Sequence, residues 1–179
     1  MPPLTQYIAD EAHYKEVLAR MGEVKRELWV GTADIKDVYI RQGRGEAAPL
    51  LGVWAGLLER GVNVRLIHAK EPGPAFREDF DRFPILATAL ERVLCPRVHF
   101  KLIIMDLECA YIGSANLTGA GIGMKSEHRR NFEAGILTTD PALVTAAIEQ
   151  FDSVWIGRHC PRCGRQKFCA DRIAGGEWR

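Results

Sequence analysis

The sequence predicts an α/β protein, an α/β/α sandwich built over a mixed β-sheet. Two patterns lead to this prediction: strand-like apolar runs alternate with amphipathic helix-like runs, and one pair of strands is joined closely enough to form a hairpin. The chain has 179 residues, of which 47% are hydrophobic and 26% charged, as in an ordinary globular domain. We therefore expect one main domain with a sizeable buried core.

Five segments in the first half of the chain follow these patterns. They are residues 10–22 (helix), 27–33 (strand), 47–60 (helix), 63–69 (strand) and 75–94 (helix). Asp10 is the expected N-cap of the first helix, because a carboxylate accepts the N–H groups that a helix start leaves unpaired. Gly61 is expected to end the second helix, and Pro84 to stop or kink the third.

The second half of the chain contains three predicted strands and one predicted helix. They are residues 97–106, 108–116 and 131–140 (strands) and 141–157 (helix). The first two of these strands form the expected hairpin. Asp140 should be the N-cap of this helix. Pro141 should be its first residue, because the fixed φ of proline suits the first helical turn.

Two polar side chains interrupt the apolar run of the strand predicted over residues 97–106. His99 and Lys101 are two positions apart, so on a strand both side chains project from the same face. A buried lysine without an opposite charge is costly, so this face should meet an anion. The sequence therefore predicts an anion-binding site here.

These two residues begin a longer pattern of fixed spacing, H-x-K-x4-D-x6-G-S-x-N. Its positions are filled by His99, Lys101, Asp106, Gly113, Ser114 and Asn116. The pattern resembles the signature of the phospholipase D superfamily, whose members cleave or exchange phosphodiester bonds. Asn131-Phe132-Glu133 is similar to the N-x-E that follows the signature in the small nucleases of this family, and the resemblance covers roughly residues 10–157.

The resemblance and the chemistry of a phosphodiester together imply roles for the matching residues. His99 would attack the phosphorus and form a phosphohistidine that water then hydrolyses. Lys101, Ser114 and Asn116 would neutralise the phosphate oxygens, the role that metal ions take in many other enzymes, so no catalytic metal is expected. The resemblance further implies that Glu133 hydrogen-bonds His99 and fixes its tautomer.

Further residues are candidates for substrate contact. Gly113 would let the backbone approach the phosphate closely. The basic stretch that contains Lys125, Arg129 and Arg130 precedes Glu133, so it should border the site and suit a polyanion, although a solvated loop is equally compatible. Asp106 counts among the candidate catalytic residues through the signature, yet its place at the end of a strand also fits a structural role.

The number of signature copies bears on the oligomeric state. Lipid-active members of the family carry two copies in one chain, whereas this chain has one; His13 is followed by Lys15 but lacks the rest of the pattern. The chemistry needs one histidine to attack and one to protonate the leaving group. The resemblance therefore implies a homodimer, with the site shared between two subunits.

A cysteine-rich stretch, CPRCGRQKFC, lies near the C-terminus. Its C-P-x-C-G resembles the knuckle of zinc ribbons, which makes Cys160, Cys163 and Cys169 candidate ligands of a structural zinc ion. The fourth ligand is open between the adjacent His159 and the remote Cys95, and an iron–sulfur cluster or metal-free thiols are the alternatives. We expect residues 1–157 to form the catalytic domain and residues 158–179 a basic, Cys-rich extension.

Taken together, these features predict a phosphodiesterase, an endonuclease that acts on DNA or RNA. The alternatives are a phospholipid hydrolase or headgroup transferase, and a non-catalytic module that binds nucleic acid. No secretory signal is visible, and the apolar, uncharged stretch of residues 47–58 has 12 residues, too few to cross a bilayer. We expect a cytoplasmic protein without a membrane partner.

Overall fold

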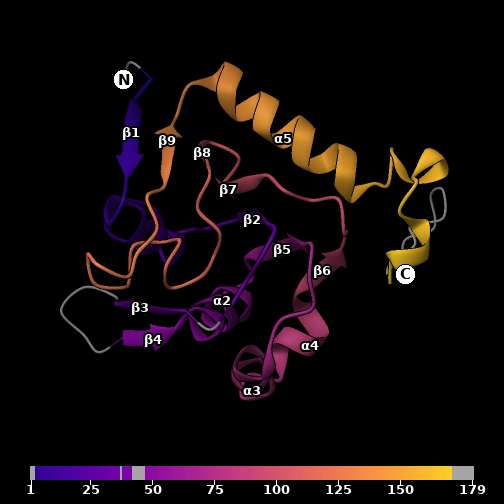
Figure 1. Ribbon diagram of the computed structural model, residues 1–179, viewed down its shortest axis with the longest axis horizontal. Coiled ribbons are helices and arrows are strands. Elements are labelled where there is room, and N and C mark those ends of the chain that lie inside the picture. The colour runs from indigo at the N-terminus through magenta and orange to yellow at the C-terminus, as the bar shows by residue number, and fades with distance from the viewer. Residues whose placement is uncertain (1–2, 37, 42–46, 171–179) are drawn as a thin grey trace.

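A seven-stranded mixed β-sheet forms the centre of the computed structural model, which describes residues 3–36, 38–41 and 47–170 (Figure 1). The strand order is β1-β9-β8-β7-β2-β5-β6. The strands are β1 (Thr5–Ala9), β2 (Glu27–Thr32), β5 (Asn63–His68), β6 (Glu91–Leu94), β7 (Lys101–Met105), β8 (Cys109–Gly113) and β9 (Ala134–Thr138). The pairs β2–β5 and β5–β6 are parallel, and the other pairs are antiparallel.

Helices cover both faces of this sheet, which confirms the predicted α/β/α sandwich (Figure 1). On one face of the sheet, α5 (Pro141–Trp155) is the helix that covers the strands in the described residues. The other elements are a helical segment (His13–Leu18) that continues as α1 (Ala19–Met21), and α2 (Leu50–Glu59), α3 (Pro74–Asp81) and α4 (Ile85–Ala89). A separate two-stranded ribbon pairs β3 (Tyr39–Arg41) with β4 (Ala47–Pro49). Among the described residues, no helix is long and apolar enough to cross a membrane.

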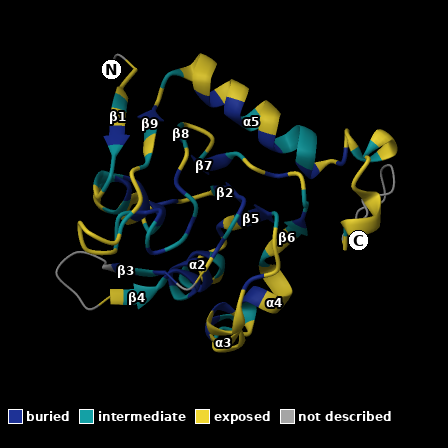
Figure 2. Cartoon of the chain, in the orientation of Figure 1, coloured by how far each residue is buried: buried dark blue, intermediate teal, exposed yellow. Residues whose placement is uncertain are grey.

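The alternation of side chains along β7 divides the core into two layers. Leu102 and Ile104 pack in the cluster beneath α5, while Ile103 and Met105 pack in the larger cluster that includes α2. Lys101 is two positions before Ile103, so its side chain emerges on the α2 face. Burial follows the same layers, with buried residues through β2, β7 and α2 and an exposed outer surface on α5 (Figure 2).

The structure corrects two predicted elements of the first half of the chain. Residues 10–22 are not one helix capped by Asp10: this residue has φ 48°, the helical segment begins at His13, and β1 precedes it. Residues 75–94 are not one kinked helix either. The chain forms α3 and α4 and then β6, which pairs in parallel with β5.

Two further predictions need adjusted bounds. The helix expected over residues 47–60 begins only at Leu50, after the short strand β4. The strand expected over residues 97–106 begins only at Lys101, so His99 lies in the segment before β7. By contrast, α5 starts as predicted, because the Asp140 carboxylate accepts the backbone N–H of Ala142 at 2.8 Å and that of Leu143 at 3.4 Å.

Candidate active site

The signature residues other than Asp106 meet at one end of the central strands, where β2 and β8 end and β7 begins. Lys101 opens β7 and pairs with Gly113 at the end of β8, while Thr32 ends β2 one residue beyond the partner of Leu102. Ser114 and Asn116 lie in the loop that follows β8, at this same end of the strands. Sites formed where strand ends converge draw residues from several elements into one place, as happens here.

Lys101 and His99 are in direct contact. The Lys101 ammonium donates to the backbone carbonyl of His99 at 2.6 Å and lies 3.2 Å from Nδ1 of the same imidazole. Lys101 is only 6% exposed, and this burial lowers the pKa of its ammonium, while the charge of the nearby Glu133 carboxylate opposes the shift. The His99 ring is exposed, so the pair presents an accessible imidazole beside a shielded positive charge.

Ser114 and Glu133 form a second contact at this end of the strands. The Ser114 hydroxyl donates to a carboxylate oxygen of Glu133 and accepts the backbone N–H of Ala134 at 3.0 Å. The other carboxylate oxygen accepts from the Asn131 amide at 3.1 Å. Among the described residues no hydrogen bond joins Glu133 to His99, so the contact that the resemblance implies is not formed in this structure, in which Asn131 and Ser114 hold the Glu133 carboxylate.

Asn116 is oriented by the end of β2. Its side-chain oxygen accepts the backbone N–H of Asp34 at 3.2 Å and lies 3.3 Å from the hydroxyl of Thr32. These contacts fix the amide by its oxygen and leave its NH₂ group as the donor that can face a substrate oxygen. The buried Thr32 was not among the predicted site residues, and its only signal in the sequence is a polar residue at the end of an apolar strand.

Gly113 lies where no side chain fits. A Cβ atom at this position would collide with the Tyr111 hydroxyl and would lie 2.8 Å from the carbonyl oxygen of Ala134. The Tyr111 phenol is buried beneath the loop, where its oxygen accepts the backbone N–H of Ala115 at 3.4 Å. Burial raises the pKa of Tyr111 to about 12, so the phenol stays protonated and supports the loop as a neutral group.

Asp106 lies at the opposite end of β7, which corrects its prediction as a catalytic residue. Its carboxylate accepts backbone N–H groups at the start of β2, from Lys25 at 3.1 Å, Arg26 at 2.7 Å and Glu27 at 3.1 Å. A strand rises about 3.4 Å per residue, so the five residues from Lys101 to Asp106 span roughly 17 Å. Asp106 therefore joins the hairpin to β2 and does not reach the site.

The basic stretch before Glu133 is split between two roles. Arg130 is held against the N-terminal segment by an ion pair with Glu11 at 3.7 Å. Lys125 and Arg129 are exposed, and Phe132, next to Glu133, is 95% exposed. The loop thus presents two positive side chains and one aromatic ring to solvent.

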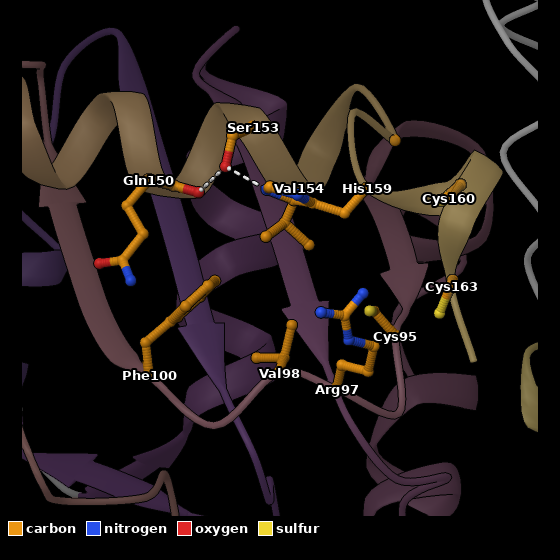
Figure 3. Close-up of a pocket in the computed structure, with 11 residues that line it drawn as sticks. Cys95, Arg97, Val98, Phe100, Gln150, Ser153, Val154, His159, Cys160 and Cys163 are labelled. Atoms are coloured by element: carbon orange, nitrogen blue, oxygen red, sulfur yellow. Dashed lines mark hydrogen bonds between the residues drawn. The ribbon is translucent and has the colours of Figure 1, made fainter. Parts of the chain in front are cut away.

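The predicted zinc ligands lie beside the end of α5. His159, Cys160 and Cys163 line a cavity together with Cys95 (Figure 3), and the Cys169 thiol lies nearby. In residues 3–36, 38–41 and 47–170 as placed, no three His, Cys, Asp or Glu side chains are close enough together to hold a metal ion. The basic residues Arg172 and Arg179 lie outside the described residues.

Comparison with known families gives a match over most of the chain. A family model described as "Cardiolipin synthase, PLD-like domain" matches residues 18–155. None of the curated proteins matches the chain significantly in sequence.

Solved structures share this fold at low sequence identity. Nuc from Salmonella typhimurium, a phospholipase D family member, has a TM-score of 0.64 at 17% identity, covering 86% of this chain and 94% of Nuc. NucT from Helicobacter pylori also has a TM-score of 0.64, at 12% identity, covering 86% of this chain and 96% of NucT. TrmBL2, an archaeal chromatin protein that binds DNA, has a TM-score of 0.58 at 15% identity, covering 84% of this chain and 51% of TrmBL2.

Proposed function

The chain belongs to the phospholipase D-like family, and from this premise we propose that it hydrolyses phosphodiester bonds of nucleic acids through a phosphohistidine, without a catalytic metal. The observation that carries the proposal is the contact between the exposed His99 imidazole and the buried Lys101 ammonium. A nucleophile and a fixed positive charge side by side suit attack on an anionic ester.

In the first step, an unprotonated nitrogen of His99 attacks the phosphorus. The P–N bond forms as the bond to the leaving oxygen breaks, and that oxygen takes a proton from a general acid. In the second step, water attacks the phosphohistidine, the P–N bond breaks and the histidine is restored. The group that acted as the acid now removes the proton from water, so protons and charge balance over the cycle.

Three donors are placed to stabilise the negative charge that develops on the phosphate oxygens. The Lys101 ammonium lies beside the imidazole, and the NH₂ group of Asn116 is held by contacts to its oxygen. The Ser114 hydroxyl donates to Glu133 in this structure and turns from it to reach a substrate oxygen. Donors fixed in advance cost little reorganisation when the charge appears.

The general acid is the His99 of a second copy of the chain, in a homodimer. One chain carries one copy of the signature, and therefore one histidine at the attacking position. A two-fold axis beside the exposed His99 would bring two equivalent imidazoles to one phosphate. Each would then attack or donate, according to its protonation state.

Nucleic acid is the substrate class that the surroundings of the site favour. Lys125 and Arg129 are exposed for contact with a phosphate backbone, and the 95% exposed Phe132 presents a ring on which a base can stack. The DNA-binding TrmBL2 shares the fold, which is compatible with this substrate. A phospholipid is the second candidate, because the matching family model carries the description of a cardiolipin synthase.

The test is a substrate panel assayed in EDTA. Bis(p-nitrophenyl) phosphate, DNA, RNA and phosphatidylcholine are offered to the full chain, and cleavage of the first and of a nucleic acid is expected. Lys101→Ala should lower the rate about 10²–10³-fold, as the loss of one preorganised donor does. The matched control is Lys25→Ala, which should keep full activity. Lys25 is exposed and lies at the opposite end of the strands, just before β2.

Two outcomes would contradict the proposal. Loss of cleavage in EDTA that Mg²⁺ restores, with circular dichroism showing an intact fold throughout, would mean that the reaction needs a catalytic metal. Hydrolysis of phosphatidylcholine alone would assign the site to lipids.

A further inference from the structure

The cavity beside the end of α5 brings together cysteines from two distant parts of the chain. It has a volume of about 240 Å³, and its lining includes Cys95, which follows β6, and Cys160 and Cys163, which follow α5. Figure 3 shows the sulfur atoms of Cys95 and Cys163 facing the same cavity. Cys95 belongs to the segment after β6, and Cys163 to the segment after α5. The proposed catalytic mechanism uses none of these residues.

The two segments have the same local sequence and the same turn. Cys95-Pro96-Arg97 is repeated as Cys160-Pro161-Arg162. In each copy the residue after the arginine donates its backbone N–H to the carbonyl oxygen of the cysteine, at 3.0 Å in the first turn and 3.1 Å in the second. Two equivalent turns thus present one cysteine each to the cavity, and the second adds Cys163.

Cys169 reaches the same place through a further short turn, residues 166–168. Its thiol lies 3.8 Å from the carbonyl oxygen of Leu94, the residue directly before Cys95. Four cysteines therefore lie near the chain segment that leaves β6, but in the described residues no three of their side chains are close enough to hold one ion, so binding requires the turns of residues 160–169 to close. Cys109, the fifth cysteine, is on β8 and belongs to the other side of the core.

The surroundings of Cys163 suit a thiolate. The backbone N–H of Arg165 donates to its sulfur at 3.4 Å, and the Arg97 guanidinium lies beside it (Figure 3). Four thiolates around one Zn²⁺ carry a net charge of −2, which nearby arginines and N–H donors compensate. A backbone N–H donor from the C-terminal segment and the Arg97 guanidinium from the segment after β6 are thus already present.

We propose that Cys95, Cys160, Cys163 and Cys169 bind one Zn²⁺ ion, which joins the C-terminal turns to the segment between β6 and β7. Four cysteines are a common ligand set of structural zinc. His159 is not needed as a ligand, since its Nε2 lies 3.4 Å from the Ser153 hydroxyl on α5. Residues 160–169 are short, exposed or half-buried turns, so they close on an ion without disturbing the core.

This site has a structural consequence for catalysis. Cys95 lies four residues before His99, and the segment between them is not part of a strand. An ion bound to Cys95 would fix one end of the segment that carries His99, while β7 fixes the other end. The zinc site would therefore act as a positioning element and not as a catalytic group.

Metal content is the first test. The full chain is purified under reducing conditions without chelators, and elemental analysis should find about one zinc per chain. Replacement by Co²⁺ should give the visible bands of a tetrahedral site and thiolate-to-cobalt charge transfer in the near ultraviolet. A protein without zinc that gives no such bands with Co²⁺, or one that holds iron and sulfide in place of zinc, would overturn the proposal.

Variants identify the ligands. Cys95→Ser should lose most of the bound zinc, whereas the matched control Cys109→Ser and the variant His159→Ala should keep it. Full zinc in Cys95→Ser together with loss in His159→Ala would overturn the ligand set. If Cys95→Ser does not fold, alkylation of the parent protein replaces it: zinc should protect the four proposed ligands and leave the labelling of Cys109 unchanged, and labelling of Cys95 in the zinc-bound protein would reject its role.

Discussion

At the scale of single residues, Asp106 shows how one carboxylate can serve the site from a distance. It takes φ 54° in the turn of the β7–β8 hairpin, and the next residue, Leu107, takes φ 59°. Two successive residues with positive φ form the kind of turn whose twist suits a hairpin, although glycine or asparagine is more usual there. The N–H groups that Asp106 binds at the start of β2 offset the cost of this conformation and fix the hairpin beside β2.

The charge of Asp106 should therefore appear in the pH dependence of stability. Burial raises the pKa of Asp106, but the N–H groups of Arg26, Glu27 and Lys25 outweigh this effect and hold the pKa below its ordinary value of 3.8. A carboxyl group whose pKa is lower in the folded state stabilises that state fully above the unfolded pKa. This contribution is lost as the pH falls through the folded pKa.

Asp106→Asn should lower the free energy of unfolding by about 1–2 kcal/mol at pH 7, since a charged hydrogen-bond acceptor is replaced by a neutral one. The difference from the parent should begin to shrink below about pH 4, where the unfolded chain takes up the proton, and should vanish as the pH falls through the lower pKa of the folded carboxyl group. Urea unfolding of both proteins from pH 7 to pH 3 measures this. A difference that stays constant over this range would show that the charge plays no part.

Residues of the site differ in how far the sequence could reveal them. Lys101, Ser114 and Asn116 lie within one short stretch whose spacing resembles a known signature, so each could be named before the fold was known. Thr32 acts through a contact that only the folded sheet creates, with a residue 84 positions away. No local pattern in the sequence predicts such contacts.

At the scale of elements, the same division separates what could be predicted from what could not. The buried strands β2 and β7 contain apolar runs, β5 has apolar residues on either side of Arg65, and α5 has a clear start signal, so local sequence predicted them. The edge strands β1 and β6 were missed. An edge strand has one neighbour and weak patterning, and β6 is a strand because β5 offers it a partner, not because its four residues favour one.

The start of α5 gives a prediction for a single element. Asp140→Ala removes the acceptor of two backbone N–H groups and should cost about 1 kcal/mol of stability. Glu149→Ala, an exposed change within the same helix, is the matched control and should stay within about 0.5 kcal/mol of the parent. Chemical unfolding of the parent and both variants measures their free energies of unfolding. An Asp140→Ala variant as stable as the parent would show that the cap contributes nothing.

At the scale of the whole molecule, the position of the site at one end of the central strands bears on the proposed homodimer. His99 is exposed, and the loop before β9 places the exposed Phe132 near the same end. An open site of this kind leaves room for a second subunit to complete it. A shared site also makes each subunit dependent on the histidine of its partner.

Subunit mixing tests that dependence. Parent and His99→Ala chains with different affinity tags are mixed, and mixed dimers are isolated by both tags. General acid catalysis contributes about 10²–10⁴-fold, so a dimer with one histidine should retain less than about a tenth of the parent rate. Mixed dimers with half the parent rate would show that each chain has its own complete site, and a parent protein that is monomeric at assay concentration would also reject the model.

The β7–β8 hairpin further bears on the order in which the site forms as the chain folds. Lys101 and Gly113 pair across a tight turn, and such a hairpin closes within about 1–10 μs. Asn116 gains its contact with Thr32 only when a strand 84 residues away has docked, which requires the closure of a long loop. The lysine side of the site is thus expected to assemble locally and early, whereas the amide side waits for β2 to arrive.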